Sequence, residues 1–444
     1  MQTLTLFVSL LGSVLVLVLR PARAFAVYVA VLLWYPTFLT VQVGTLDFKA
    51  GRIIVAVLLL RCLANGNIRS SFRWSAIDSW MVFGVCVEMF VPFISYYIPF
   101  MRILENRGGA LMDGFFAYLA TRFCIKDRTE LVTVIKWIGI AMIPIAFLGV
   151  VESFTGWMPF VPLRKYCPWN SKIGEITTRH GFFRAIGPSG HPITFGASFA
   201  MFVPLIYWLR YREGISRSLC YFMTAMAVLG TVSSMSSGPL VLLLLIIVCL
   251  ILEDFKEWVK PLIIFSVFSC IGIGIISNRP FYHVFASYVN PFGGTGWHRA
   301  KLIDLAIEHF NEWWLMGYGG LDPGWGPALG NEWTDITNQY ITYGVMYGIL
   351  GVVTFVGILV TSLIMMIRCY KTEKDPMLKS CFWALGGLII SFMISFNSFT
   401  LFAQSGTLFI CILGIAASLS SYSLSSDPNN NLPAQRNRLT SKCQ

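Results

Sequence analysis

Apolar blocks of about 20 residues recur along the whole chain and constrain its fold more than any other feature. About 20 apolar residues in a helix cross the ~30 Å hydrocarbon layer of a bilayer. Of the 444 residues, 56% are hydrophobic and only 12% are charged, whereas a soluble domain carries about 25% charged residues. The sequence therefore predicts an all-α fold, a polytopic transmembrane bundle in which most of the chain lies in lipid.

The apolar runs predict 11–13 spans, with 12–13 fitting the pattern best. The third run could instead be a short or half-inserted helix, because Arg52 and Arg61 bracket its apolar core. The predicted helices are 3–19, 24–43, 50–64, 77–96, 109–125, 130–152, 190–209, 218–235, 238–253, 259–277, 339–367, 379–397 and 402–421.

Basic residues sort the predicted loops into two sides of the membrane. The net charge of +11 resembles that of a nucleic-acid-binding protein, but short loops between spans hold most of the basic residues, which is the expected orientation signal. Under the thirteen-span reading, the side with Arg20, Arg73 and Lys126 is cytoplasmic. The membrane domain is predicted to cover 1–425, followed by a disordered cytoplasmic tail over 426–444. No nucleic-acid partner is expected.

The opposite side receives two long loops, about 153–188 and 278–338, and loops of such length commonly carry function. All five histidines lie in these loops or at their membrane edge, together with seven of the fourteen tryptophans. The first loop also places several basic residues outside the membrane, against the charge rule. One interpretation is an aromatic belt with solvated or headgroup-binding charges. The other is an outward-facing site with flat faces for sugar rings and arginines for an anion such as phosphate.

The sequence gives no support for several other chemistries. It contains no His pair with metal-ligand spacing and no CxxC motif, so neither a metal site nor another cofactor is expected. A Walker A sequence and a GxSxG elbow are both missing, which argues against ATP-driven work and against a serine hydrolase. The eleven cysteines lie mostly in apolar blocks and suggest no disulfide framework.

Three segments on the predicted outer side combine charge with helix-terminus signals. The first, 184–196, places Arg184 and a Gly-Pro-Ser-Gly turn before His191 and Pro192 at the mouth of a span, where a helix N-terminus favours an anion. The second, 296–310, has the periodicity of an amphipathic surface helix with Arg299 near its start. The third, 337–351, returns to the membrane through Asn338.

The order and spacing of these segments resemble the O-antigen ligase and polysaccharide polymerase superfamily of bacterial membrane proteins, over roughly 109–351. The family has an Arg-x-x-Gly segment before a span, matched by Arg184 and Gly187. Its second arginine opens a helix that ends in a glycine-rich turn, matched by Arg299 and by 315–319. Its Asn-x-Tyr entry to a Gly-x-x-Gly span is matched by Asn338, Tyr340, Gly348 and Gly351.

This resemblance implies glycan transfer at the outer face of the bacterial cytoplasmic (inner) membrane, from undecaprenyl-pyrophosphate-linked glycan as the donor. It further implies membrane lipid and polysaccharide export or chain-length proteins as partners. The residues expected to act in catalysis are Arg184, Arg299, His298 and Asn338. Those expected to bind substrate are His191, Gly187, Arg179, His180, Tyr340 and Trp297. The general base is left open among His298, His191, His180, Asp335 and Glu332.

Two departures from the family pattern bear on the reaction. Thr337 occupies the position of the family's histidine, and a Ser-Arg-Gly turn reads Ser236-Ser237-Gly238. Since the ligases use that histidine, a polymerase of exopolysaccharide or O-antigen repeat units is favoured over a ligase that joins glycan to a lipid A core. A secondary transporter or flippase of lipid-linked glycan is the rival of another class, since Glu88, Asp113 and Arg122 fall within or at the ends of spans.

Overall fold

Apolar helices make up most of the structure. The computed structural model describes residues 1–44, 46–94, 99–167, 176–211, 214–278, 280, 282–284 and 296–425. Among these residues, seven helices are long and apolar enough to cross a membrane, and three shorter apolar helices have 14–17 residues. The predicted all-α, polytopic membrane fold is thereby confirmed.

The elements have the following bounds. The α-helices are α1 (Gln2–Val18), α2 (Pro21–Trp34), α3 (Ala50–Ala64), α4 (Gly66–Ser70), α5 (Ala76–Ile94), α6 (Phe100–Leu111), α7 (Ala117–Cys124), α8 (Arg128–Thr155), α9 (Pro192–Ala200), α10 (Val203–Trp208), α11 (Arg217–Ser233), α12 (Ser237–Ile251), α13 (Val259–Ile276), α15 (Gly296–Glu308), α16 (Phe310–Trp313), α17 (Gln339–Thr372), α18 (Pro376–Ser395) and α19 (Ala403–Ser425). A π-helix, η1 (Met112–Phe116), joins α6 to α7. Short 3₁₀ turns are η2 (Val161–Tyr166), η3 (Gly187–Ser189), η4 (Leu209–Tyr211), η5 (Lys256–Trp258) and η6 (Pro327–Leu329). Two antiparallel hairpins pair β1 (Thr40–Val43) with β2 (Leu46–Lys49) and β3 (Thr178–Arg179) with β4 (Phe182–Phe183).

Each of the thirteen predicted apolar runs contains helix, but two boundaries were wrong. The predicted helix 24–43 ends at Trp34, and 40–43 forms strand β1 instead. Tyr35 is extended because it precedes Pro36, and a residue before proline avoids the helical region. The predicted helix 109–125 starts nine residues earlier, at Phe100. Its first turns carry Arg102, Glu105 and Arg107, which made that part resemble a loop.

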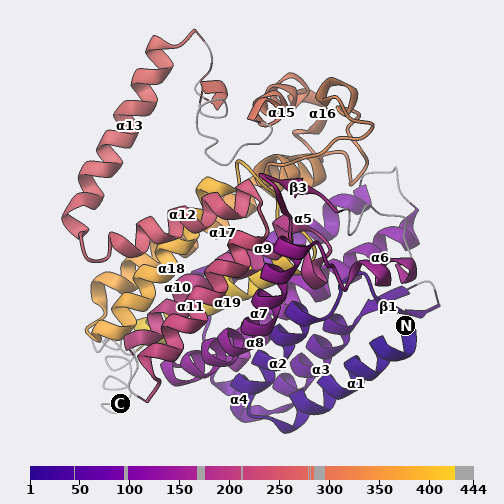
Figure 1. The fold of residues 1–444 in the computed structure, drawn as a ribbon, viewed down its shortest axis with the longest axis vertical. Helices are drawn as coiled ribbons and strands as arrows, with labels where there is room; N and C mark the ends of the chain where they lie inside the picture. The colour runs from indigo at the N-terminus through magenta and orange to yellow at the C-terminus, as the bar shows by residue number, and fades with distance from the viewer. Residues whose placement is uncertain are drawn as a thin grey trace, which may run out of the picture.

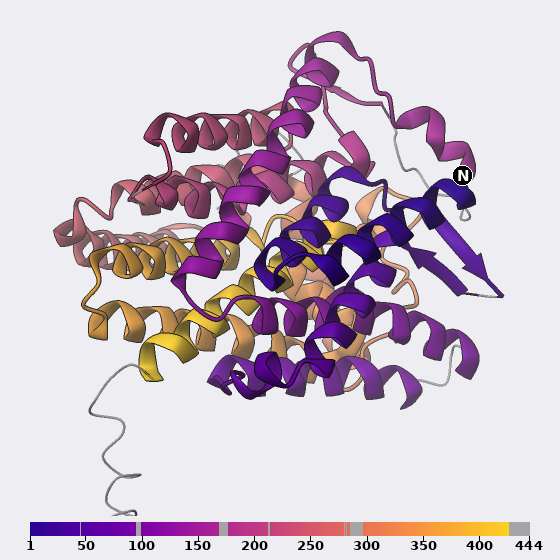
Figure 2. The same ribbon diagram turned by 90° about the horizontal axis from the view of Figure 1, so that it is seen from below.

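Helix α19 lies at the centre of the bundle, where it contacts α7, α9, α17 and α5. Figure 2 shows it crossing the middle of the molecule, and 83% of its apolar window is buried. Glycines allow several helices to approach closely, as is common where lipid gives no hydrophobic drive to association. A Cβ at Gly139 would lie 2.8 Å from the Met223 sulfur, and one at Gly414 would lie 2.8 Å from Thr121.

Helix α13 stands apart from the other helices (Figure 1). It is among the more apolar of the membrane-length helices, yet none of its apolar window is buried against the described part of the chain. An apolar helix of this kind is stable only where lipid covers it on every side. The structure therefore contains one helix that takes no part in the core of the bundle.

The two predicted long loops and two short turns meet at one end of the bundle, which we call the loop end. The backbone N–H of Ala185 donates to Ser233 O, joining the first loop to the end of α11. Gln339 N donates to Phe396 O, and Thr400 Oγ1 donates to Ile336 O, joining the second loop to the α18–α19 turn. The predicted tail, 426–444, and parts of both loops, 168–175 and 285–295, lie outside the described residues.

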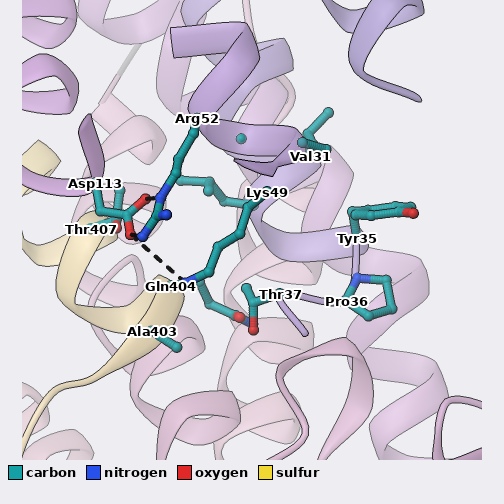
Figure 3. A pocket seen from close by; sticks show the side chains of 13 residues that line it. Val31, Tyr35, Pro36, Thr37, Lys49, Arg52, Asp113, Ala403, Gln404 and Thr407 are labelled. Atoms are coloured by element: carbon teal, nitrogen blue, oxygen red, sulfur yellow. Dashed lines mark hydrogen bonds and ion pairs between the residues drawn. The ribbon is translucent and has the colours of Figure 1, made fainter. Parts of the chain in front are cut away.

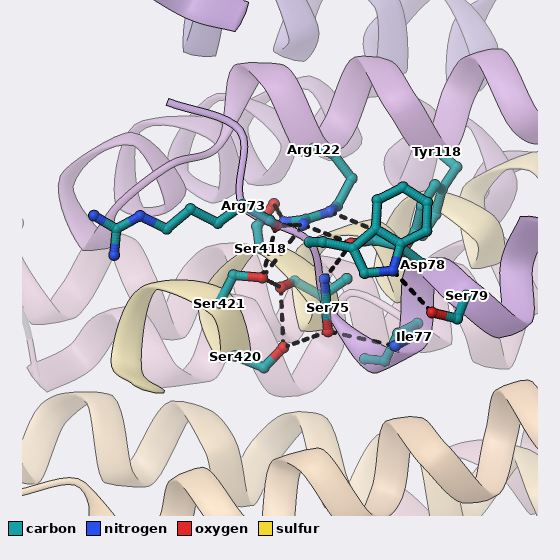
Figure 4. Close-up of polar contacts among 12 residues, drawn as sticks. Arg73, Ser75, Ile77, Asp78, Ser79, Tyr118, Arg122, Ser418, Ser420 and Ser421 are labelled. Carbon is teal, nitrogen blue, oxygen red and sulfur yellow. Dashed lines mark hydrogen bonds and ion pairs between the residues drawn. The ribbon is translucent and has the colours of Figure 1, made fainter. Parts of the chain in front are cut away.

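A buried ion pair joins three helices at the opposite end of the bundle (Figure 4). The guanidinium of Arg122 on α7 donates through Nε and Nη2 to the two carboxylate oxygens of Asp78 on α5, at 2.9 and 2.8 Å. Asp78 also accepts from Tyr118 Oη at 2.5 Å and from Ser75 N at 2.6 Å. Arg122 Nη1 reaches Ser418 on α19 at 3.2 Å. Both charges are thus paired and hydrogen-bonded, which makes their burial tolerable.

We expect Asp78→Ala to destabilise the protein by about 3–5 kcal/mol, because it leaves the Arg122 charge buried without a partner. Thermal unfolding in detergent measures this loss. Arg128→Ala is the matched control, since it breaks an ion pair with Asp375 whose side chains are about a third exposed but leaves the Asp375 cap of α18 in place, and about 1 kcal/mol or less is expected there. Equal losses in the two variants would contradict the prediction.

Candidate functional site

Three arginine side chains contact one short turn at the loop end. The turn, Ser234–Ser237, joins α11 to α12, and we call it the serine turn. Arg179 Nη1 donates to Met235 O at 3.4 Å, Arg184 Nη2 donates to Ser236 Oγ at 3.3 Å, and Arg299 Nη2 donates to Ser237 Oγ at 3.2 Å. The three side chains therefore contact three consecutive residues, although they come from β3, the segment after β4, and α15.

None of these three arginines forms an ion pair with a carboxylate in the described part of the chain. Burial lowers the pKa of Arg184 to about 10, and the neighbouring charge of Arg179 adds to this effect. Burial also lowers the pKa of Arg299, again with a contribution from Arg179. Both remain cationic at neutral pH. Arg184 Nε is buried with no hydrogen-bond partner, so the cluster offers unused donors to an anion.

The backbone that carries Arg184 is fixed by a carboxylate that the sequence analysis missed. Glu152, near the end of α8, is fully buried, and its Oε2 accepts from Ile186 N and Gly187 N, both at 2.9 Å. Arg184 N donates to Thr177 O at 2.9 Å. Each backbone N–H from 184 to 187 therefore has an acceptor, which holds the arginine in place before any ligand arrives. The only sequence signal was an acidic residue at the end of an apolar run.

Gly187 has a structural role in this turn. Its φ is +48°, and a Cβ there would lie 2.4 Å from the ring of Phe195. A side chain would be strained in conformation and would also clash. Gly187 thus serves the geometry of the turn, and its role in substrate binding stays a prediction.

His191 and His298 flank the cluster as neutral imidazoles. Burial lowers the pKa of His191 to about 4, with a further contribution from Arg184. Its Nδ1 accepts from Ile193 N at 3.2 Å, which caps α9. Burial lowers the pKa of His298 as well, and the nearby Arg299 acts in the same direction while Asp335 opposes it. Both ring nitrogens of buried His298 have no hydrogen-bond partner, so this imidazole is available to take a proton.

The glycine-rich turn after α15 docks into a break in α17. Gly348 departs from helical geometry, with φ 68° and ψ −165°. Tyr318 N donates to Val345 O at 2.6 Å, and Ile349 N donates to Trp314 O at 2.7 Å. A Cβ at Gly348 would lie 2.4 Å from Leu315 O. Two of the segments that matched the family pattern, 315–319 and 337–351, are thus in direct contact, and they fix the loop that carries Arg299.

Asn338 and Tyr340 hold structural positions in the described contacts. Asn338 Oδ1 caps α17 by accepting from Tyr340 N at 2.9 Å and from Ile341 N at 3.2 Å. Tyr340 Oη donates to Met393 O at 2.7 Å, which ties α17 to α18. Thr337, which replaces the family's histidine, has a buried Oγ1 with no partner. These contacts hold the entry segment in place, and none of them involves the three arginines.

Trp297 and His180 lie outside the cluster. The Trp297 side chain is 62% exposed on α15, and two residues of helix turn it about 200° away from Arg299. His180 is exposed at the tip of the β3–β4 hairpin, with φ 51°. Two other candidate bases, Glu332 and Asp335, are exposed too. His298 and His191 both lie beside an arginine of the cluster. His191 caps α9 through Nδ1, whereas neither ring nitrogen of His298 has a hydrogen-bond partner among the described residues.

The described residues contain no group of three His, Cys, Asp or Glu side chains arranged to hold a metal ion. Comparison with models of known protein families gives no match, and comparison with curated proteins gives none either. The helix lengths and compositions define a polytopic membrane protein with an arginine cluster at its loop end.

We expect Glu152→Ala to raise amide hydrogen exchange at Ile186 and Gly187 at least about tenfold, because both N–H groups lose a charged acceptor. Exchange measured by mass spectrometry on the full chain tests this. Glu152→Gln retains an acceptor oxygen and should remain close to wild type, as should Glu308→Ala, which lies at an exposed position of α15. Unchanged protection in Glu152→Ala would show that the carboxylate does not hold the turn.

His191 should also make stability depend on pH. The folded pKa of about 4 lies below the ordinary value of 6.5, so the unfolded chain binds the proton more readily in this range. The stabilisation is complete above about pH 6.5 and is lost as the pH falls toward 4. Melting temperatures of wild type and His191→Asn over this range check it, since asparagine caps a helix without titrating. An identical pH dependence in both proteins would exclude His191 as the titrating group.

Proposed function

We propose that this protein is a glycosyltransferase that acts on undecaprenyl-pyrophosphate-linked oligosaccharide at the outer face of a bacterial cytoplasmic membrane. It would polymerise repeat units of exopolysaccharide or O-antigen. The observation that carries this proposal is the cluster of Arg179, Arg184 and Arg299 on the serine turn, without a carboxylate partner in the described residues. Partly buried cations in this state favour a multiply charged anion, and pyrophosphate is one.

The chemistry follows from the leaving group. An acceptor hydroxyl attacks the anomeric carbon of the donor sugar, and the bond from that carbon to the pyrophosphate oxygen breaks. Negative charge then grows on the pyrophosphate, where fixed arginines stabilise the transition state more than the ground state. The reaction needs no nucleotide, since the lipid pyrophosphate already activates the sugar.

His298 is the group best suited to accept the proton of the attacking hydroxyl. Its imidazole is neutral because burial lowers its pKa, and both ring nitrogens are unpartnered. It adjoins Arg299 in sequence and interacts with that guanidinium electrostatically. A neutral base beside the anion site is the arrangement that general base catalysis requires.

Polymerisation is favoured over ligation because Thr337 stands where the resembling ligases have a histidine. A transporter of lipid-linked glycan is the second candidate. Of the three charged residues that support it, Arg122 is paired with Asp78, and Asp113 is paired with Arg52. Such pairs hold helices together and leave less charge available for a transport pathway.

We expect Arg184→Ala and Arg299→Ala each to lower polymer formation about 100-fold or more, because each removes an electrostatic donor to the leaving group. The assay is product length from purified lipid-linked repeat units, with protein level in the membrane measured alongside. Lysine at either position retains the charge but loses the bidentate fork, so partial activity is expected.

Lys301→Ala is the control, since it removes a cation from the same helix about 200° away from Arg299. A normal product ladder in both arginine variants would refute the site. A single addition to a lipid A core would indicate a ligase. Passage of lipid-linked glycan across vesicles without joining would indicate the transporter.

A further inference from the structure

A cavity of about 420 Å³ lies beneath the loop end, between α5, η1, α17 and α19. Its deep walls are apolar, with Met81, Ile358 and Leu413 at the far end from the loops. On α19 the lining runs from Ala403 to Leu413, a length of about 15 Å at 1.5 Å per residue. A long apolar slot of this kind suits a hydrocarbon chain rather than a sugar.

A second cationic centre lies where the cavity meets a small neighbouring crevice, which shares Lys49 and Asp113 with it (Figure 3). Arg52 binds Asp113 through two hydrogen bonds, at 3.0 and 2.7 Å, and Lys49 approaches the same carboxylate at 3.7 Å. Two cations thus share one carboxylate. Burial lowers the pKa of Lys49, and the charge of Asp113 opposes this effect, so one positive charge is in excess whenever Lys49 is protonated. Lys49 and Asp113 line the large cavity itself.

The amide of Gln404 lies beside Lys49 (Figure 3). Gln404 is 4% exposed, its Oε1 has no hydrogen-bond partner among the described residues, and it lines the small crevice that Lys49 and Asp113 also line. Amide oxygen and nitrogen can exchange places by rotation, so this side chain can present N–H donors to an anion. The junction of cavity and crevice thus combines this cationic centre with the Gln404 amide, while the slot behind it is apolar.

A second carboxylate in the cavity wall, Glu88, has its own cationic neighbour. Glu88 lines the cavity and interacts with Tyr343 by a hydrogen bond and with Arg107 electrostatically. Arg107 in turn donates to Tyr347 Oη at 2.7 Å. Glu88 therefore has a cationic neighbour on its own side of the wall and does not cancel the excess charge at Lys49.

The cavity adjoins the arginine cluster without being part of it. Phe402 lines the cavity, and its ring meets the His191 ring edge-on with centroids 4.9 Å apart. His191 interacts in turn with Arg184. The contact between Phe402 and His191 therefore lies between two cationic centres. One contains Lys49 and lies above the apolar slot, and the other is the arginine cluster on the serine turn.

We infer that this cavity binds the polyisoprenoid chain of a second, acceptor substrate, with its phosphate against Lys49 and Gln404. The inference rests on the proposed function, since a polymerase joins two lipid-linked units and needs a place for each. The donor pyrophosphate occupies the arginine cluster, and the acceptor chain occupies the slot.

The test uses the full chain in phosphatidylcholine nanodiscs and undecaprenyl phosphate carrying a photoreactive group on its chain. Labelled peptides are identified by mass spectrometry, and we expect label on 81–89 and 403–413. Gly406 lines the cavity, and a Cβ there meets nothing within 4 Å. Gly406→Phe should therefore place a ring in the slot and reduce labelling at least about tenfold, since it displaces several methylenes of the chain.

Gly272→Phe is the matched control, because Gly272 also has open space at its Cβ but lies on α13, away from the cavity. It should label as wild type does. Lys49→Gln should weaken labelling about tenfold through the lost contact to phosphate. Arg184→Ala should leave labelling unchanged, because the slot is separate from the arginine cluster.

Equal labelling in Gly406→Phe and Gly272→Phe would overturn the site. Loss of label in Arg184→Ala would also overturn it, since the chain in the slot would then belong to the donor. Displacement by an equal amount of phosphatidylglycerol would identify a general lipid slot and overturn the assignment to polyisoprenoid. Polymer formation is read separately. If polymer forms but the cavity is not labelled, the cavity assignment is wrong and the proposed function stands. If the cavity is labelled but no polymer forms, the proposed function is wrong and the lipid site stands.

Discussion

Burying a charge away from water costs several kcal/mol unless another group compensates it, and this constraint organises both ends of the bundle. At one end, Arg122 is compensated within the chain by both oxygens of Asp78. At the loop end, Arg184 and Arg299 are partly buried, but among the described residues they contact serine hydroxyls and no carboxylate. Hydroxyls satisfy hydrogen bonds but supply no opposing charge. The same residue type therefore stabilises the fold in one place and, among the described residues, has no opposing charge in the other.

The backbone around the arginine cluster is held rigidly, which offsets part of the free-energy cost of burying these charges without a carboxylate. Glu152, Gly187 and the backbone of Ser233 fix the Arg184 segment, and α17 fixes the segment that carries Arg299. A ligand that arrives at prealigned donors does not have to order them first, so more of the binding energy remains available. Glu152 contributes through one oxygen only, since Oε2 accepts from two backbone N–H groups while Oε1 has no hydrogen-bond partner among the described residues.

The helices could be predicted from the sequence because lipid imposes a length and an apolar composition that any reader can count. Arg179 and Arg184 stood out in the sequence because basic charge in a loop predicted to lie outside contradicts the usual distribution, whereas Arg299 stood out near the start of a predicted amphipathic helix. Glu152 and the serine turn could not, since their roles depend on which backbone groups tertiary packing brings near them. Asn338 and Tyr340 carried the right motif, yet their side chains form a helix cap and a helix-helix contact. Helix boundaries failed at Pro36 and at charged α6, where local composition imitates a loop.

The docking of 314–318 into α17 has a consequence for the whole architecture. At Gly348 the hydrogen-bond ladder of a membrane helix is interrupted, and groups that water would otherwise satisfy are instead taken up by Tyr318 N and Trp314 O. Backbone N–H and C=O groups inside the membrane are costly to leave without a hydrogen-bond partner, because no water reaches them. Residues 314–318 of the loop outside the membrane thus supply hydrogen-bond partners that the interrupted helix α17 lacks. Displacing the loop would unwind the helix, so the two parts form one mechanical unit rather than a scaffold with an appendage.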